Sequence, residues 1–337
     1  MSLLAQGSYG CVYYPGYSCK NKKMNKKYVS KLSRDDKESQ VEYNMSKIVK
    51  KIPNYSKHFI VIERKCKVKQ PKINKIKNGC EFIQKRDYPS YVLMYSKYLK
   101  SKELNEIIIN EVLTKATLIQ LTQIISNRIR ELLSVGIIHM DLHFANILVS
   151  DKNNRLYVID FGLALDSNRF FIGGKINTSY IESKWHSYTT NWPSFCLEYI
   201  FISLIVKENQ TLTKHNIFST IRDYYNNHKV LNTLLDKTYI EETYEYYKFL
   251  ENNSSENNLK LLISSSNTWD HYKLAYNILK YMSIKSIEFV ELKWLLLLMM
   301  HPIPTYRPTQ EELSEHFKHY SELFQNKVNT NNITFKD

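Results

Sequence analysis

A cluster of polar side chains between two apolar runs constrains this chain most. Residues 136–149 read GIIHMDLHFANILV, which places two histidines, an aspartate and an asparagine close together. A plain buried strand would carry none of them. An amphipathic helix predicted over 118–133 ends just before the cluster, at Gly136. The cluster is therefore predicted to be a loop between that helix and the short strand 146–150.

Three side chains in and near this loop suit phosphate chemistry. Asp141 can orient a hydroxyl group and accept its proton, and Asn146 offers an amide oxygen to a hard cation. Asp160 ends the next predicted strand, LYVID, and is followed by Phe-Gly. A carboxylate beside a flexible glycine can chelate a Mg²⁺ ion that bridges two phosphates. Either aspartate alone could be a turn residue, but the ordered set favours phosphoryl transfer.

The N-terminal segment LLAQGSYGCVYYP predicts two strands joined by a glycine turn. Gly7 and Gly10 flank that turn, and their missing side chains let backbone N–H groups approach phosphate oxygens. The ordinary alternative is a turn between strands that serves no ligand. Lys31 lies in an apolar strand and needs a partner, which Glu42 on the following helix can provide; the alternative is two surface charges.

Strands are predicted mostly before residue 165 and helices mostly after it, which indicates an α+β fold in two lobes. Strands 59–63 and 91–96 are expected on either side of a basic looped segment, 64–80. A flexible loop is expected over 252–258 and a loose polar tail over 325–337.

The bulk composition excludes some classes of protein. The net charge of +14 permits an acidic or nucleic-acid partner, but lysine, asparagine, isoleucine and tyrosine, which have AT-rich codons, are all abundant. Because no clustered aromatic and basic motif occurs, nucleic-acid binding is not favoured. We find no apolar run long enough to cross a membrane and no signal-peptide pattern, so no membrane partner is predicted and a cytoplasmic location is expected.

The five cysteines are odd in number and scattered, and none forms a CxxC pair. This pattern argues against a zinc site and against a disulfide framework. It indicates a reducing compartment.

These motifs, taken in order, resemble the eukaryotic protein kinase superfamily. QGSYGCV is similar to its glycine-rich loop, with Ala5 in place of the first glycine. HMDLHFAN resembles the catalytic loop, and DFG stands intact at 160–162. The segment GSYGCVYYPGYSC and the abundance of residues with AT-rich codons are similar to those of kinases of large DNA viruses. A viral protein of this kind would be expected in the host cytoplasm or the virion.

The resemblance continues through the second half of the chain. Glu198 resembles the glutamate that closes the activation segment, and Arg307 in YRPT resembles the arginine that pairs with it. Asp270 in DHYKLA resembles the aspartate that braces the catalytic loop. The resemblance implies an N-lobe over 1–97 and a C-lobe over 98–325, followed by the tail from residue 326. Residues 199–268 then form an insertion.

The resemblance implies a serine/threonine protein kinase that uses ATP and Mg²⁺ and acts on protein substrates. It gives a catalytic role to Asp141, Lys31 and His143, and Mg²⁺ binding to Asn146 and Asp160. Hinge contacts with adenine are expected from residues 95–98, which follow Met94. The residues expected to bind the nucleotide are Gly7, Ser8, Tyr9, Gly10, Val12, Val29, Lys31, Glu42, Met94 and Leu148.

Two departures from the family pattern keep alternatives open. Met140 replaces the arginine before the catalytic aspartate, so phosphorylation of the activation segment is not expected to be the switch. His143 replaces the lysine two residues after that aspartate, as in small-molecule kinases of the aminoglycoside and choline type. The alternatives are therefore a small-molecule kinase or a scaffold without activity. The insertion itself could be a docking surface, an autoinhibitory cover or a self-packed elaboration.

Overall fold

A computed structural model describes residues 2–7, 10–19, 26–68, 79–84, 90–228, 238–251, 253–324 and 334–337. The chain divides into two compact units, and the α+β class predicted from the sequence is confirmed. The first unit comprises residues 1–104, 145–164 and 336–337, and the second comprises residues 105–144 and 165–335. Each unit is described separately below.

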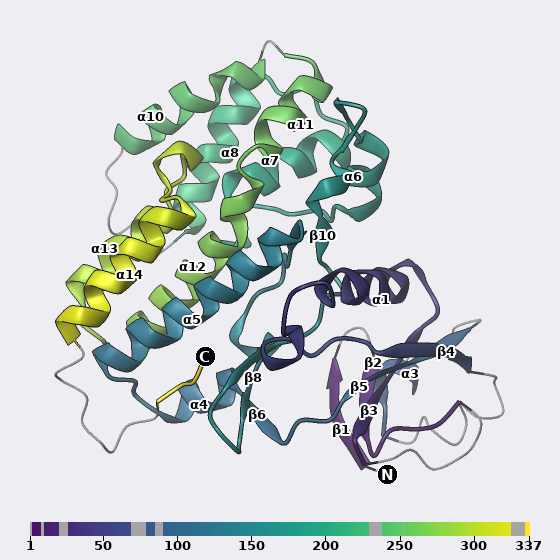
Figure 1. Cartoon of the computed structure of the whole chain (residues 1–337). Helices are drawn as coiled ribbons and strands as arrows, with labels where there is room; N and C mark the ends of the chain where they lie inside the picture. The colour runs from purple at the N-terminus through teal and green to yellow at the C-terminus, as the bar shows by residue number, and fades with distance from the viewer. Residues whose placement is uncertain are drawn as a thin grey trace. The chain divides into compact units, whose positions relative to one another are not determined.

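The first unit is built on a five-stranded antiparallel sheet (Figure 1). The strand order is β1 (Ser2–Gly7), β2 (Gly10–Tyr14), β3 (Tyr28–Arg34), β5 (Tyr91–Lys97), β4 (Arg64–Val68). Strand β5 is apolar at successive positions because both of its faces are buried. Tyr91, Leu93 and Tyr95 join one apolar cluster, whereas Val92 and Met94 join another with Ile62.

Helix α1 (Lys37–Val49) follows β3 directly. A capping box between Asp36 and Ser39 fixes its start, because each side chain accepts a backbone N–H group that the first turn leaves unpaired. Its apolar residues Val41 and Met45 are buried at helical spacing. Glu42, next to Val41, is buried as well, which an isolated surface charge would not be.

A smaller three-stranded sheet completes the first unit. It has the order β6 (Ser101–Glu103), β8 (Ile147–Ser150), β9 (Leu156–Val158). The first unit also holds η1 (Tyr55–Lys57) and α3 (Glu81–Gln84). The β8–β9 hairpin carries Asn146 just before its first strand and Asp160 just after its second, so the sheet fixes both ends of this segment.

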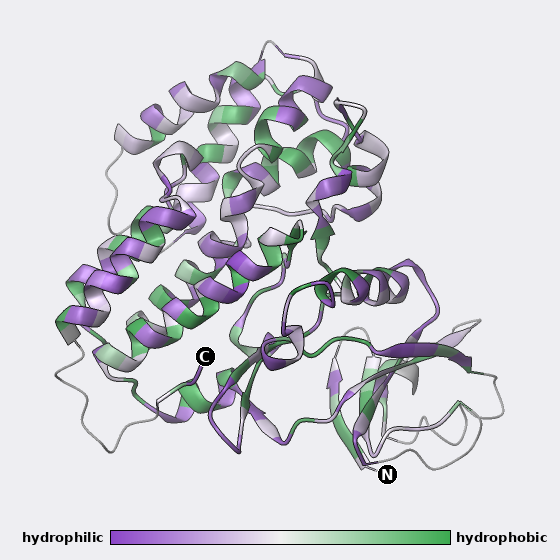
Figure 2. Cartoon of the chain, in the orientation of Figure 1, coloured by the Kyte–Doolittle hydropathy of each residue, from purple (hydrophilic) through white to green (hydrophobic). Residues whose placement is uncertain are grey.

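The second unit is mainly helical (Figure 1). Helix α5 packs against α12 and α14, and α12 also packs against α13. Figure 2 shows polar and apolar residues alternating along α14, whereas α7 is largely apolar because it is buried on nearly all sides. The helices in chain order are α4 (Leu104–Asn110), α5 (Lys115–Ser134), α6 (Thr178–Lys184), α7 (Leu197–Val206), α8 (Lys214–Asn227), α10 (Thr238–Tyr247), α11 (Ser255–Ile263), α12 (Trp269–Ile284), α13 (Val290–Met299) and α14 (Gln310–Phe324).

Short elements join these helices. Strand β7 (Ile137–Ile138) pairs with β10 (Leu165–Asp166), and β11 (Phe171–Ile172) pairs with β12 (Lys175–Ile176). The 3-10 turns are η2 (Phe144–Asn146), η3 (Ser167–Arg169), η4 (Lys248–Glu251), η5 (Ser266–Thr268) and η6 (Pro304–Tyr306). Across the described ranges, no helix has the length and apolar character needed to cross a bilayer.

Two loops predicted from the sequence are wrong where the structure describes them. Residues 64–68 of the basic segment form β4, an edge strand whose charged side chains are typical of exposed sheet edges; residues 69–78 lie outside the described part of the chain. Within 252–258, Ser254 caps α11, which begins at Ser255, because serine and asparagine favour helix starts as well as loops.

The tail prediction also needs correction at its end. Phe335 is buried and its backbone N–H donates to Gln120, while Lys336 forms a β-bridge with Arg155 in the first unit. A buried aromatic residue close to the terminus anchors it, which a polar composition does not reveal. The rest of the predicted tail, 325–333, lies outside the described residues.

The absence of disulfides predicted from the cysteine pattern is wrong. Cys11 on β2 is bonded to Cys80 before α3, and Cys19 is bonded to Cys66 on β4. The partners are 69 and 47 residues apart, so neither local spacing nor an odd total could reveal the pairing. Cys196 is free and buried.

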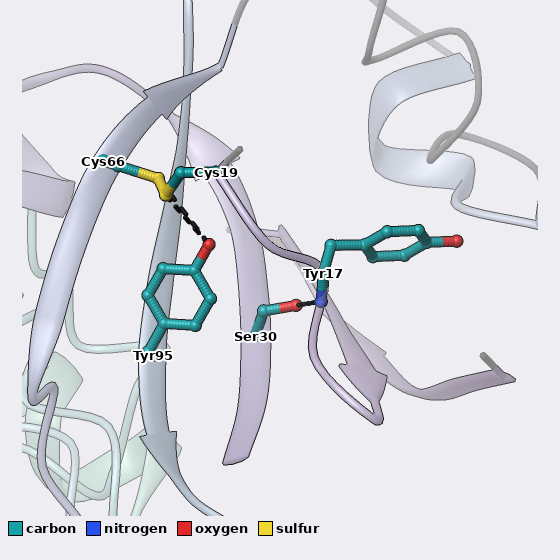
Figure 3. The surroundings of a disulfide bond; sticks show 5 residues. All are labelled: Tyr17, Cys19, Ser30, Cys66 and Tyr95. Atoms are coloured by element: carbon teal, nitrogen blue, oxygen red, sulfur yellow. Dashed lines mark hydrogen bonds between the residues drawn. A yellow bond between two sulfur atoms is a disulfide. The ribbon is translucent and has the colours of Figure 1, made fainter. Parts of the chain in front are cut away.

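The second disulfide lies against Tyr95 of the central strand β5. Figure 3 shows the Tyr95 ring pointing at the two sulfur atoms, with its hydroxyl 3.0 Å from Cys19 Sγ and 3.6 Å from Cys66 Sγ. Beside it, the Tyr17 N–H donates to Ser30 Oγ at 2.9 Å. The disulfide therefore joins the segment after β2 to the edge strand β4.

We predict that removing the Cys11–Cys80 disulfide lowers the stability of the first unit. The double variant C11S/C80S should lose about 2–5 kcal/mol in denaturant unfolding, because the unfolded chain is no longer held in a long closed loop. The oxidation of four of the five cysteines is checked by counting thiols in denaturant. Five cysteines with four in disulfides leave one reactive thiol before reduction, whereas all five react afterwards. Five thiols without reductant would contradict the pairing, and C196A should remove the single early signal.

Candidate active site

Lys31 on β3 is the centre of an ionic cluster within the first unit. Its Nζ lies 2.9 Å from Glu42 Oε2 on α1 and 3.3 Å from Asp160 Oδ2 after β9. Burial by itself would lower the pKa of Lys31, but the charges of Glu42 and then Asp160 outweigh burial and raise that pKa above its usual range. Burial also raises the pKa of Glu42. One lysine thus holds two carboxylates, and the partner predicted for Lys31 is in place.

Asp160 is held in an unusual backbone conformation that aims its side chain. Its φ of 62° is in the left-handed region, which aspartate tolerates better than most residues. One carboxylate oxygen accepts the Gly162 N–H at 3.2 Å, and the other faces Lys31. The neighbouring Phe161 is buried against Phe59, with ring centroids 6.3 Å apart. Packing of the phenylalanine therefore fixes the aspartate beside it.

Asn146 and Asp160 are connected through the backbone. The Ile159 N–H donates to the Asn146 carbonyl at 3.0 Å, which holds the residues before and after the β8–β9 hairpin together. An amide oxygen and a carboxylate are hard oxygen donors of the kind Mg²⁺ prefers. Among the described residues, three or more His, Cys, Asp or Glu side chains nowhere gather as a metal cluster. One amide oxygen and one carboxylate are few ligands, and they suit an ion that takes its other ligands from phosphates and water.

The two glycines of the predicted phosphate loop differ in what the fold requires of them. Gly10 has φ 152°, and a Cβ atom there would lie 2.2 Å from the Leu32 carbonyl oxygen, so β3 itself demands glycine. A Cβ atom on Gly7 would meet nothing within 4 Å. Ser8 and Tyr9, also predicted to contact phosphates, lie outside the described residues. The described part of the fold thus gives no steric reason for glycine at position 7, and its phosphate role stays a prediction.

We predict that G7A and G10A fail in different ways. G7A should keep the wild-type melting temperature and raise KM for ATP, because its methyl group occupies space next to the loop without touching the sheet. G10A should lower the melting temperature through its clash with β3 and its strained backbone. Thermal unfolding and steady-state kinetics separate the two effects. A G7A protein with unchanged KM for ATP would remove Gly7 from the predicted nucleotide site.

The side chains predicted to surround adenine are also in the first unit. Val12 on β2, Val29 on β3 and Leu148 on β8 are half-buried, so each keeps exposed apolar surface, whereas Met94 on β5 is fully buried. Of the hinge groups, the Tyr95 carbonyl accepts from Glu63 at 2.7 Å. The Tyr98 N–H donates to Lys27 at 2.8 Å. These two backbone groups of 95–98 are therefore already bonded within the unit.

Asp141 in the second unit lies between two nitrogen side chains. Lys273 Nζ on α12 is 3.2 Å from Oδ1, and His143 Nε2 is 3.6 Å from Oδ2. Burial alone would raise the pKa of Asp141, but His143 and then Lys273 hold it well below its usual range. An aspartate that stays ionised is a weak base and a firm hydrogen-bond acceptor, which suits alignment of a hydroxyl group.

Asp270 at the start of α12 braces the loop that carries Asp141. Its carboxylate is buried and accepts the N–H groups of His139 at 2.6 Å and Met140 at 3.0 Å. Met140, which stands where the family has arginine, adopts a left-handed φ of 66° and is buried. The Tyr199 hydroxyl donates to its sulfur at 2.7 Å. The Met140 side chain is therefore bonded to an uncharged tyrosine.

The predicted pair of Glu198 and Arg307 is present in the second unit. The two side chains form a bidentate pair, with N–O distances of 2.7 and 3.0 Å. Both are only 1% exposed. Ser265 donates to Glu198 at 3.0 Å, and Arg307 donates to the Thr268 hydroxyl at 2.9 Å. The pair thus joins α7 to η5 and to the segment before α14.

The predicted insertion, 199–268, is helical where the structure describes it, and several of its tyrosines turn inward while others keep partial exposure. Tyr224 and Tyr225 on α8 and Tyr247 on α10 are buried. The Tyr224 hydroxyl bonds to that of Tyr272 on α12, and the Tyr247 hydroxyl donates to the Pro302 carbonyl at 3.0 Å. Of the three interpretations of the insertion, these contacts favour the self-packed one, because tyrosines that fill a core are not free to bind a partner.

One residue of the second unit was missed at the sequence level. Lys273 belongs to DHYKLA, in which only Asp270 was assigned a role. The missed signal is the spacing: a lysine three positions after the bracing aspartate lies on the same face of the helix and reaches the same loop. A lysine between Tyr272 and Leu274 in a buried helix is also itself unusual.

The comparison with protein families agrees with this geometry. The family described as the protein kinase domain matches residues 1–190, more than half of the 337 residues. None of the curated proteins matches the chain. The match covers Lys31, Glu42, Asp141, Asn146 and Asp160, and ends before the Glu198–Arg307 pair. With a β-sheet unit that holds the lysine cluster and a helical unit that holds the aspartate loop, this chain belongs to the protein kinase family.

Proposed function

We propose that this protein kinase transfers the γ-phosphoryl group of ATP to serine and threonine hydroxyls of protein substrates, with Mg²⁺ as the metal. The observation that carries the proposal is the cluster of Lys31, Glu42 and Asp160, with Nζ–O distances of 2.9 and 3.3 Å. A buried lysine next to an outward-facing carboxylate combines a cation for phosphate oxygens with a ligand for a metal ion. A scaffold without activity would need neither.

The first unit acts on the nucleotide in this proposal. Lys31 contacts the α- and β-phosphates, and Glu42 holds its side chain in place. Asn146 and Asp160 hold Mg²⁺, which when bound neutralises negative charge on the phosphates. Gly7 leaves room for backbone N–H groups to approach the phosphates. These residues work by positioning and by fixed charge rather than by covalent chemistry.

The second unit acts on the acceptor. Asp141 accepts a hydrogen bond from the acceptor hydroxyl, which directs the oxygen toward the γ-phosphorus atom. As the new P–O bond forms, Asp141 takes the proton, the bond from the γ-phosphorus to the β–γ bridging oxygen breaks, and ADP leaves. A buried Glu198–Arg307 pair supports protein substrates, because it anchors the segment that leads from residue 165 to α7. In the family this segment receives the polypeptide substrate.

Transfer to a small amino-alcohol or aminoglycoside is the second candidate. The observation in its favour is His143, which stands two residues after Asp141 with its Nε2 3.6 Å from that carboxylate. Small-molecule kinases with an Asp-Leu-His pattern have a histidine at the corresponding position.

One transfer experiment separates these functions. The purified chain is incubated with γ-labelled ATP and Mg²⁺ in parallel with casein, histone, choline and kanamycin. We expect label on casein or histone, and hydrolysis of the labelled protein should release phosphoserine or phosphothreonine. Phosphotyrosine alone would overturn the serine/threonine assignment, and label on choline or kanamycin alone would establish the second candidate. No label on any acceptor, with no melting-temperature rise in Mg·ATP, would indicate a scaffold.

A further inference from the structure

Helix α12 presents three polar side chains to the loop 139–142. Asp270, Lys273 and Asn277 occupy positions i, i+3 and i+7, so they lie along one face of the helix. Asp270 accepts two backbone N–H groups of the loop at 2.6 and 3.0 Å, and Asn277 Nδ2 donates to one of its carbonyls at 3.0 Å. All three residues therefore bond to the loop backbone, and Lys273 also reaches the side chain of Asp141.

Lys273 is nearly excluded from water and fully engaged. Its side chain is 7% exposed, and its Nζ donates to the Met140 carbonyl at 3.0 Å and to Asp141 Oδ1 at 3.2 Å. The same ammonium group lies 4.2 Å from the ring centroid of Phe195, which precedes α7. A buried lysine is costly unless its charge has a defined partner, and here the partner is Asp141.

The loop itself has no permanent positive charge beside Asp141. The family places a lysine two residues after this aspartate, but here that position is His143, an imidazole that is charged only when protonated. The two oxygens of Asp141 therefore face different groups, with Oδ1 toward Lys273 and Oδ2 toward His143. Lys273 reaches the carboxylate from helix α12, whereas His143 belongs to the same loop as Asp141.

We propose that Lys273 is the positioning residue for Asp141. From its place on α12 it performs the role of the lysine that is missing from the catalytic loop. By binding Oδ1 it fixes the carboxylate so that Oδ2 faces the acceptor hydroxyl. The inference rests on the proposed function, since it assigns a role through Asp141. Its contact with Phe195 extends this fixed arrangement to the segment before α7, without any phosphorylated residue.

The charges around Asp141 define a pH signature for this role. Within the second unit, His143, then Lys273 and then His139 lower the pKa of Asp141 against the effect of burial, and Asp270 acts on Lys273 from the same helix. Loss of the lysine charge therefore raises the pKa of Asp141. Because transfer needs the ionised carboxylate, the acid limb of the pH–rate profile of K273M must then rise toward the working pH range, whereas wild-type Asp141 stays ionised well below that range. A purely structural lysine would leave that limb in place.

The test compares K273M with the wild type on casein or histone, whichever the wild type labels. Methionine keeps the length of the side chain and removes its charge. We expect kcat to fall about 100-fold, with KM for ATP changed less than about threefold. As the pH falls toward about 4, K273M should lose rate faster than the wild type, because its Asp141 is protonated at a higher pH. K280M, which removes an exposed lysine from the same helix, should behave as the wild type.

Moving the lysine back into the loop is the decisive variant. H143K in the K273M background should recover at least about tenfold of the lost kcat, because it restores a charge beside Asp141. No recovery, together with an unmoved acid limb in K273M, would overturn the inference. If K273M fails to fold, K273R is used for the test instead. Arginine keeps the positive charge, so the acid limb of K273R should match that of the wild type, and an acid limb at higher pH would overturn the inference. Wild-type protein that labels no acceptor defeats the proposed function instead.

Discussion

Replacing Asp160 by asparagine is expected to reduce phosphoryl transfer by about 10³-fold or more. The amide keeps a carbonyl oxygen for the Gly162 N–H, now 3.2 Å away, so the local fold should survive. It loses the negative charge that lies 3.3 Å from Lys31 Nζ and that would bind the metal. D160N should therefore keep the wild-type melting temperature without nucleotide but lose most of the rise caused by Mg·ATP.

Two further variants make this result specific. D151N changes an aspartate of the turn between β8 and β9, in the same unit as Asp160, and should retain full activity. D141N should bind Mg·ATP as the wild type does while turnover falls by about 10²–10⁴-fold, the usual contribution of a positioned base. Near-full turnover in D141N, or an undiminished Mg·ATP shift in D160N, would show that the corresponding role is wrongly assigned.

Replacing Arg307 by alanine is expected to lower the free energy of unfolding by about 3–5 kcal/mol. The reason is the carboxylate left behind: Glu198 is 1% exposed, and its pKa lies below the usual value because Arg307 outweighs burial. Without the guanidinium, the buried charge keeps the hydrogen bond from Ser265 but loses its bidentate counterion. Denaturant unfolding followed by circular dichroism measures the loss.

A second substitution tests whether the buried charge is the cause. R307A/E198Q should be more stable than R307A, because glutamine removes the uncompensated charge although it restores no ion pair. R307K should recover little, since an ammonium group cannot make the bidentate contact. R222A removes an exposed arginine of α8 and should cost less than about 0.5 kcal/mol. A loss below about 1 kcal/mol for R307A would mean that the pair contributes as a surface pair does.

The sequence was sufficient to predict an interaction wherever the chemistry of one side chain at one position required a partner. The lysine in an apolar strand implied a partner, and Glu42 is that partner. Asp270 and the Glu198–Arg307 pair followed from the resemblance and lie as expected. In each case a charged group stands in an apolar context, where burial requires a counterpart.

The sequence was insufficient where the information is in tertiary distance. The disulfides join cysteines 69 and 47 residues apart, and no local pattern distinguishes them from free thiols. The sequence of β4 is as rich in charged residues as that of a loop, because β4 is an edge strand of its sheet. Lys273 has a defined role only because α12 and the loop 139–142 come together in the second unit.

The bracing of the catalytic loop by α12 has a consequence for synthesis. The segment that matches the kinase family ends at residue 190, whereas Asp270, Lys273 and Arg307 follow later in the chain. Chains emerge from the ribosome with the N-terminus first. A nascent chain that has just completed the matched segment therefore carries Asp141 on a loop with no helix to hold it. The chain is therefore expected to become active only after α12 has been made. The unfinished polypeptide should not phosphorylate substrates that it meets during translation.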